Sequence, residues 1–111
     1  MSSGEPDIAR LYRREIAAAH IIAGHPRCGR LHGHNYQLLA KVYGRGDEWL
    51  DFEDIKKKVD QFIDEKYDNH DIGNMSCEKL ARQLQEQLSN FFKTPVKIEL
   101  WETGKFGVET V

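Results

Sequence analysis

Two histidines separated by one glycine, His32 and His34, form the most distinctive chemical pattern in the sequence. On a β-strand, residues i and i+2 point to the same face, so both imidazoles would project into one site. Gly33 removes side-chain bulk where the backbone and a metal ion would lie close, and His20 is the natural third ligand. Three neutral imidazoles with an open fourth position are typical of catalytic Zn²⁺. The alternative is a pair of hydrogen-bonded surface histidines at a strand start.

A cysteine, Cys28, precedes His32 by four residues in a glycine-containing loop. It could be a fourth zinc ligand, a nucleophile or general base, or an ordinary thiol, and a nearby cation would favour its thiolate. The other cysteine, Cys77, lies far along the chain, and we expect two separate thiols rather than a disulfide. His25, next to Pro26, reads as an ordinary loop residue.

The composition indicates one globular domain. The chain has 111 residues, of which 40% are hydrophobic, and domains commonly contain about 100–150 residues. With 16 Lys and Arg against 18 Asp and Glu, the net charge of −2 excludes an electrostatically driven nucleic-acid binder. No apolar run approaches the roughly 18 residues of a membrane span, and residues 1–7 lack the pattern of a secretory signal. We therefore expect a cytoplasmic domain over residues 8–111, with no nucleic-acid or membrane partner, after a flexible leader at residues 1–7.

Strands are expected to position the histidines. Residues 8–22 are ambiguous, because the alanines favour a helix while the short span before His25-Pro26 suits a strand. Residues 35–43 have the composition of a strand and end at the turn signal Gly44-Arg45-Gly46.

Two helices are expected to follow. Asp51 is a good N-cap for a helix that ends near residue 67, with apolar side chains every three or four residues and a turn at residues 68–71. Ser76 is the N-cap of a second helix that Thr94-Pro95 stops. Residues 96–101 alternate as a half-buried strand, and residues 106–111 return as the last strand. The fold class is thus α+β, with an antiparallel four-stranded sheet and two helices on one face. The other face or the edges should contact further subunits.

A resemblance covers most of the chain. Ala18-Ala19-His20, followed by Cys28-Gly29-Arg30-Leu31-His32-Gly33-His34-Asn35-Tyr36, resembles the 6-pyruvoyl-tetrahydropterin synthase family. The Cys-x3-His-Gly-His spacing is most similar to the 6-carboxy-tetrahydropterin synthases of queuosine biosynthesis. Further matches follow in the family's order, at Leu50-Asp51-Phe52, Asp68, Ser76-Cys77-Glu78-Lys79-Leu80-Ala81 and Glu102-Thr103. Such an ordered set is much more specific than any one motif.

The resemblance implies a tunnelling fold, whose subunits join their sheets into a barrel, commonly as a hexamer of two trimers. It implies that His20, His32 and His34 hold Zn²⁺, which binds the side-chain hydroxyls of 7,8-dihydroneopterin triphosphate. It also implies that Cys28 is the proton-transfer base, served by an Asp-His pair from a neighbouring subunit.

The same resemblance implies a pterin site. Glu102 and Glu78 would anchor the N–H groups of the ring, because charge-assisted hydrogen bonds are strong. Ser76 and Cys77 stand where the family has Thr-Ser, and we include them in the substrate site. The alternative is that neither residue binds substrate: Glu78 would interact favourably with the dipole of its helix, and Glu102 would be a solvated residue at the end of a strand. Arg27 and Arg30 flank Cys28 in the sequence and are candidates to bind the triphosphate of the substrate.

The chain departs from the family at the proton relay. The family's Asp-His-x-x-Leu-Asn aligns most simply with Asp68-Asn69-His70-Asp71-Ile72-Gly73, which puts Asn69 where the catalytic histidine belongs. A shift of one residue aligns His70 and Asn74 with the family's His and Asn, but puts Asn69 in place of the Asp. An amide cannot transfer protons, so we expect Cys28 and His70 to move them, with Asp68 orienting His70.

The expected activity is that of a zinc-dependent carbon–carbon lyase. It would convert 7,8-dihydroneopterin triphosphate to 6-carboxy-5,6,7,8-tetrahydropterin and release acetaldehyde and triphosphate. One alternative is formation of 6-pyruvoyl-tetrahydropterin by triphosphate elimination. Another, motivated by Asn69, is a pterin-binding zinc protein that has lost catalysis.

Overall fold

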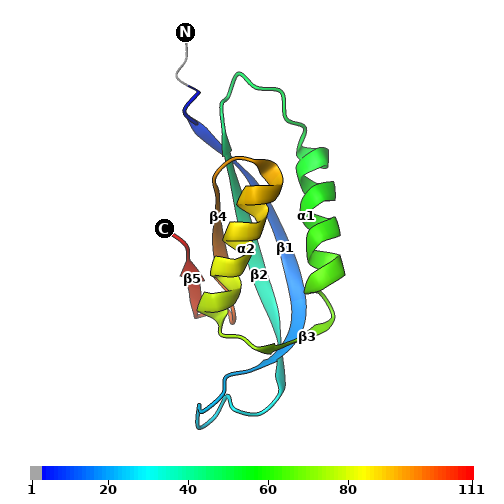
Figure 1. The fold of residues 1–111 in the computed structure, drawn as a ribbon, viewed down its shortest axis with the longest axis vertical. Coiled ribbons are helices and arrows are strands. Elements are labelled where there is room, and N and C mark those ends of the chain that lie inside the picture. The colour runs from blue at the N-terminus through cyan, green and yellow to red at the C-terminus, as the bar shows by residue number, and fades with distance from the viewer. Residues whose placement is uncertain (1–3) are drawn as a thin grey trace.

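The computed structural model, which describes residues 4–111, places two helices on one face of a five-stranded sheet (Figure 1). The order of the strands across the sheet is β3-β1-β2-β4-β5. The predicted α+β class is confirmed, while the leader predicted at residues 1–7 lies partly outside the described residues. In chain order the elements are β1 (Ile8–Ile21), β2 (His32–Gly44), α1 (Phe52–Lys66), β3 (His70–Asn74), α2 (Cys77–Phe92), β4 (Val96–Trp101) and β5 (Gly107–Glu109).

Strands β1 and β2 form a long antiparallel pair whose register runs from Ile8 opposite Gly44 to His20 opposite His32. The ambiguous first segment is therefore a strand, although alanine favours helices. Ile16, Ala18 and His20 are buried while the residues between them are half-buried, which is the two-residue period of a strand packed on one face. Burial against the helices thus outweighs the intrinsic preference of the alanines.

Both helices begin at the predicted caps. The side chain of Asp51 accepts a hydrogen bond from the Glu53 N–H at 2.9 Å, and Ser76 Oγ accepts one from the Lys79 N–H at 3.1 Å. These bonds satisfy backbone donors that the first turn leaves unpaired. Each helix buries one apolar face on the sheet, consisting of Ile55, Val59 and Ile63 in α1 and of Leu80, Leu84 and Leu88 among others in α2.

The segment predicted as a turn at residues 68–71 instead enters β3, which pairs with β1 in the parallel direction. The predicted four-stranded antiparallel sheet was therefore one strand short. The chain leaves α1 through Asn69, whose φ of 60° lies in the left-handed region that asparagine tolerates better than most residues. Its N–H then donates to the Ala17 carbonyl of β1 at 2.5 Å. Five polar-rich residues without alternation carry no strand signal in the sequence, so the pairing comes from the path of the chain.

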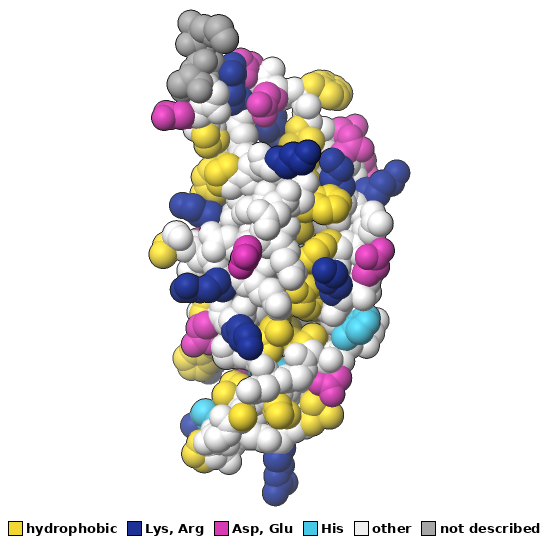
Figure 2. Space-filling model, viewed as in Figure 1, with side chains coloured by type: hydrophobic (Ala, Val, Ile, Leu, Met, Phe, Trp, Pro, Cys, Tyr) yellow, Lys and Arg dark blue, Asp and Glu magenta, His cyan; other side chains and the backbone are white. Residues whose placement is uncertain are grey.

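Charges of both signs are intermixed over the helix side of the molecule (Figure 2). This distribution agrees with the balanced composition and shows no single-sign field on that side. The helix-free face of the sheet carries a hollow of about 470 Å³ lined in part by Arg13, Gln37, Leu39 and Trp101. Within residues 4–111, neither helix combines the length and the apolar character needed to cross a membrane.

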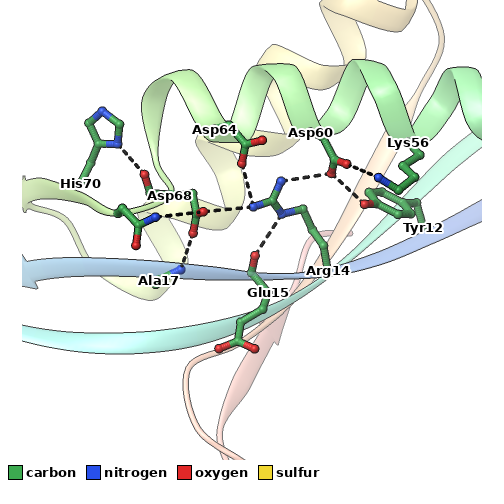
Figure 3. A network of polar contacts seen from close by, with 10 residues as sticks. Tyr12, Arg14, Glu15, Ala17, Lys56, Asp60, Asp64, Asp68 and His70 are labelled. Carbon is green, nitrogen blue, oxygen red and sulfur yellow. Dashed lines mark hydrogen bonds and ion pairs between the residues drawn. The ribbon is translucent and has the colours of Figure 1, made fainter.

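An ion-pair network fastens α1 to β1 (Figure 3). The guanidinium of Arg14 lies 3.0 Å from carboxylate oxygens of both Asp60 and Asp64, and 3.5 Å from that of Asp68. Tyr12 donates a hydrogen bond of 2.7 Å to Asp60, and Lys56 donates another. Burial alone would raise the pKa of Asp60, but these hydrogen bonds and the Arg14 charge outweigh it and lower that pKa.

Candidate metal and pterin site

Three histidines meet on the helix side of the sheet. His20 near the end of β1 stands opposite His32 at the start of β2, and Ala18 stands opposite His34. The antiparallel register therefore places all three imidazoles on one face, with potential ligand atoms within 4.8 Å of one another. The ring centroid of His20 lies 4.4 Å from that of His32 and 4.9 Å from that of His34. The set predicted from the HxH spacing is thus assembled in space.

The hydrogen bonds of the rings fit a cation. The Nδ1–H of His20 donates to the Met75 carbonyl at 2.6 Å, and that of His32 donates to the Arg30 carbonyl at 2.7 Å. Bonds of this kind fix the tautomer of metal-binding histidines and leave the lone pair of Nε2 for the metal. The Nε2 atom of His34 is buried without a hydrogen-bond partner. A bound cation would satisfy this atom, whose isolation otherwise costs free energy.

A carboxylate borders the histidine cluster. Glu102 Oε1 lies 3.0 Å from His34 Nε2, at the distance of an ion pair but without the geometry of a hydrogen bond. Burial lowers the pKa of His34, while the charge of Glu102 opposes that shift and the neighbouring His20 and His32 add to it. The net effect favours the neutral imidazole, which is the form that binds metal.

Glu102 also lines a cavity of about 190 Å³ together with Cys77, Glu78, Phe106 and two further residues of the β5 strand. Burial, followed by the charges of Glu102 and Glu78, raises the pKa of the Cys77 thiol to about 12. The uncharged thiol of Cys77 therefore forms part of the cavity wall, and it contacts the Leu100 carbonyl. The structure brings Glu78, Glu102 and Cys77 together, whereas Ser76 lies outside the cavity lining and caps α2.

Cys28 lies partly buried in the loop that joins β1 to β2, the two strands that carry the histidines. Its carbonyl accepts the Ile22 N–H at 2.7 Å, and its N–H donates to His25 Nδ1 at 2.9 Å. His25 is thus the organising side chain of this loop rather than an ordinary loop residue. The signal that sequence reasoning passed over is a side-chain acceptor placed three residues before Cys28, as in an Asx turn. Arg27 and Arg30 are exposed in the same loop.

His70 is the first residue of β3 and pairs with Ala18 of β1, while Asp68 lies two residues earlier, between α1 and β3. The Nδ1–H of His70 donates to the backbone carbonyl of Asp68 at 2.7 Å. The Asp68 carboxylate accepts the Ala17 N–H at 2.9 Å and pairs with Arg14 (Figure 3). The Asp68 carboxylate therefore binds groups of β1. The contact that orients the His70 ring comes from the backbone carbonyl of Asp68 and not from its carboxylate. Within residues 4–111 no hydrogen bond joins His70 to Cys28.

These features define a small α+β domain with a candidate three-histidine metal centre beside a carboxylate-lined cavity. Residues 11–111 match the family described as 6-pyruvoyl tetrahydropterin synthase, and the chain belongs to that family.

Two archaeal relatives, both provisionally named 6-carboxy-5,6,7,8-tetrahydropterin synthase, match parts of the chain. The protein from Methanocaldococcus jannaschii is 47% identical over 54 residues, which are 45% of this chain and 33% of the relative. The protein from Archaeoglobus fulgidus is 38% identical over 66 residues, which are 57% of this chain and 56% of the relative. The matches therefore span a third to just over half of the length of these relatives.

Solved structures of the family share the whole fold. The 6-pyruvoyl tetrahydropterin synthase of Caenorhabditis elegans superposes with a TM-score of 0.77 at 18% identity, covering 99% of this chain and 100% of that one. The Plasmodium falciparum protein gives a TM-score of 0.68 at 19% identity, covering 94% and 98% of the two chains. The expected tunnelling fold is confirmed, with the additional strand β3.

Proposed function

We propose that this chain is a zinc-dependent carbon–carbon lyase that converts 7,8-dihydroneopterin triphosphate to 6-carboxy-5,6,7,8-tetrahydropterin, acetaldehyde and triphosphate. The observation that carries the proposal is the position of Glu102, which borders both the histidine cluster and the cavity shared with Glu78. The names of the two archaeal relatives support the 6-carboxy product. The pathway we propose is queuosine biosynthesis in the cytoplasm, with residues 8–111 acting as one domain.

The metal-binding residues in this proposal are His20, His32 and His34. Three imidazoles and no thiolate leave a position open for substrate, as catalytic zinc sites do. When bound, Zn²⁺ would act as a Lewis acid toward the hydroxyl-bearing side chain of the substrate. The Met75 and Arg30 carbonyls hold the rings of His20 and His32 in the tautomer that this role needs.

The pterin-binding residues are Glu78 and Glu102. Both carboxylates line the same cavity, where burial and then their charges raise the pKa of the Cys77 thiol. Two carboxylates make the cavity favourable for hydrogen-bond donors and positive charge. The amide and amino N–H groups of a pterin are such donors. Phe106 and Val108 add apolar walls against which a flat ring can lie.

The proton-transfer residues in this proposal are Cys28 and His70, which lie in different segments of the chain. A homo-oligomer, which we expect to be a hexamer made of two trimers, would bring His70 of one subunit to Cys28 of another. The helix-free face of the sheet and its edge strands β3 and β5 offer surfaces for this assembly.

The test is a turnover assay on zinc-loaded protein with 7,8-dihydroneopterin triphosphate, with products identified by mass spectrometry. A carboxylated tetrahydropterin with an equal amount of acetaldehyde is the expected result. A 6-pyruvoyl product would replace the lyase by the elimination reaction. Unchanged substrate that stays bound would favour a catalytically impaired pterin-binding zinc protein, for which Asn69 in place of histidine is the motivating observation.

A further inference from the structure

We propose that His25 is a positioning residue that holds the turn carrying Cys28, by acting as an acceptor for two backbone N–H groups. The inference rests on the proposed function to the extent that Cys28 is the proton-transfer base there. Its structural part, the order of the turn, does not depend on any activity.

The hydrogen bonds of the loop converge on His25. Its Nδ1 atom accepts the N–H of Arg27 at 3.1 Å and the N–H of Cys28 at 2.9 Å. Its carbonyl accepts the Gly29 N–H at 3.0 Å, and its own N–H donates to the Ile22 carbonyl at 3.1 Å. In both side-chain bonds Nδ1 is the acceptor and a backbone N–H is the donor. His25 thus connects the residues on both sides of the thiol.

Packing does not replace these bonds, because residues 23–27, 29 and 30 are exposed and only Cys28 is partly buried. The loop is also too tight for a side chain at residue 29, where a Cβ atom would lie 2.9 Å from the His25 carbonyl oxygen. The conformation of the Cys28 turn therefore depends on its hydrogen bonds. The acceptor that His25 provides reaches the Cys28 N–H itself.

His25 does not belong to the histidine cluster. The cluster of possible metal-binding groups within residues 4–111 consists of His20, His32 and His34 and does not include it. The Nδ1 atom of His25 is already occupied by two donors. Its role is therefore in the backbone of the loop, and we assign it no contact with substrate or metal.

The test compares two variants that differ in the acceptor. In His25→Asn, the amide oxygen is bonded to Cγ as Nδ1 is in histidine, so it can accept the same backbone N–H groups. His25→Leu has a similar bulk but offers no acceptor. Amide hydrogen exchange of Arg27 and Cys28 is measured by NMR on zinc-loaded protein, and kcat and KM are measured on the same samples. Zinc content and circular dichroism confirm that each variant is folded and loaded.

We expect His25→Leu to speed exchange of the Arg27 and Cys28 amides about 10-fold, the effect of losing such bonds. We also expect kcat to fall on the order of 10-fold to 100-fold with little change in KM, because a catalytic group is displaced. His25→Asn should restore both. Equal exchange in the two variants, or failure of the asparagine to rescue kcat, would overturn the positioning role. If exchange follows the prediction while even the unmodified protein shows no turnover, the turn assignment holds and the proposed function fails.

Discussion

The carboxylate of Glu102 lies 3.0 Å from Nε2 of His34 and also faces the cavity that Glu78 lines. One side chain at the end of β4 therefore belongs to two neighbouring sites. In the proposed function, it contacts the pterin ring on one side and a metal-binding imidazole on the other.

We expect Glu102→Gln to weaken zinc binding by roughly 10-fold, because the carboxylate lies beside Nε2 of His34 and its negative charge attracts a cation there. Pterin binding should weaken in the same variant, because the amide is a poorer acceptor for the ring N–H groups. Competition with a zinc chelator and calorimetric titration with a pterin measure the two effects. Glu99→Gln is the matched control, since Glu99 lies on β4 three residues before Glu102 and pairs with Lys41. A variant at 102 that loses neither affinity would contradict the double role.

The two cysteines should differ in reactivity. The pKa of Cys77, raised to about 12 by burial and by Glu102 and Glu78, keeps this thiol protonated at neutral and mildly alkaline pH. We expect iodoacetamide at about pH 8 to label Cys28 alone in the folded protein, since the thiolate is the nucleophile. Mass spectrometry of the peptides gives the site, and Cys28→Ser should remove the label. Labelling of Cys77 before unfolding would contradict the burial of its thiol in the structure.

His70→Ala should reduce turnover by on the order of 100-fold if His70 transfers protons. Zinc content and pterin binding should stay unchanged, because the ring contacts the Asp68 carbonyl and not the histidine cluster. Asn69→Gly is the control: the left-handed φ of 60° suits glycine, so the backbone is retained while the side chain is removed. Turnover equal to that of the unmodified protein in His70→Ala would exclude the relay.

The Arg14 network should make stability depend on pH. The pKa of Asp60 is lowered in the folded state, so its stabilising contribution is fully present above the unfolded pKa and is lost as pH falls through the folded one. We expect Asp60→Ala to lower the free energy of unfolding near neutral pH by about 1–3 kcal/mol, because Arg14 and Tyr12 lose a partner.

Urea unfolding at several pH values measures that difference. The gap between Asp60→Ala and the unmodified protein should narrow as the pH falls from about 5 to about 2. A gap that is constant over this range would mean that the charge of Asp60 contributes nothing. Asp60→Asn keeps the shape of the side chain but removes its charge, so its gap to the unmodified protein should narrow over the same range.

The helices and most strands could be predicted from the sequence because their signals are local. Asp51 and Ser76 are cap residues followed by apolar side chains at helical spacing, and residues 96–101 alternate. The β3 strand has no such signal, since its pairing depends on where α1 delivers the chain beside β1. Local patterns do not contain that information.

The candidate site was predictable in its residue types more than in its contacts. The HxH spacing and His20 indicate the histidine cluster, because alternate residues of a strand lie on the same face of the sheet. The contacts of the Asp68 carboxylate with Arg14 and Ala17 form only when the chain after α1 folds back beside β1. The acceptor role of His25 depends in turn on the shape of one loop. Neither follows from the types of the residues alone.

The partner of His20 Nδ1 is a backbone carbonyl, that of Met75, directly before the cap of α2. Every residue type has that carbonyl oxygen, so the ring orientation of His20 depends on the backbone path and not on the identity of residue 75. Related sequences should therefore accept any apolar side chain at this position that packs on the core. What selection has to preserve there is the spacing between β3 and α2, and an inserted or deleted residue would do more harm than a substitution.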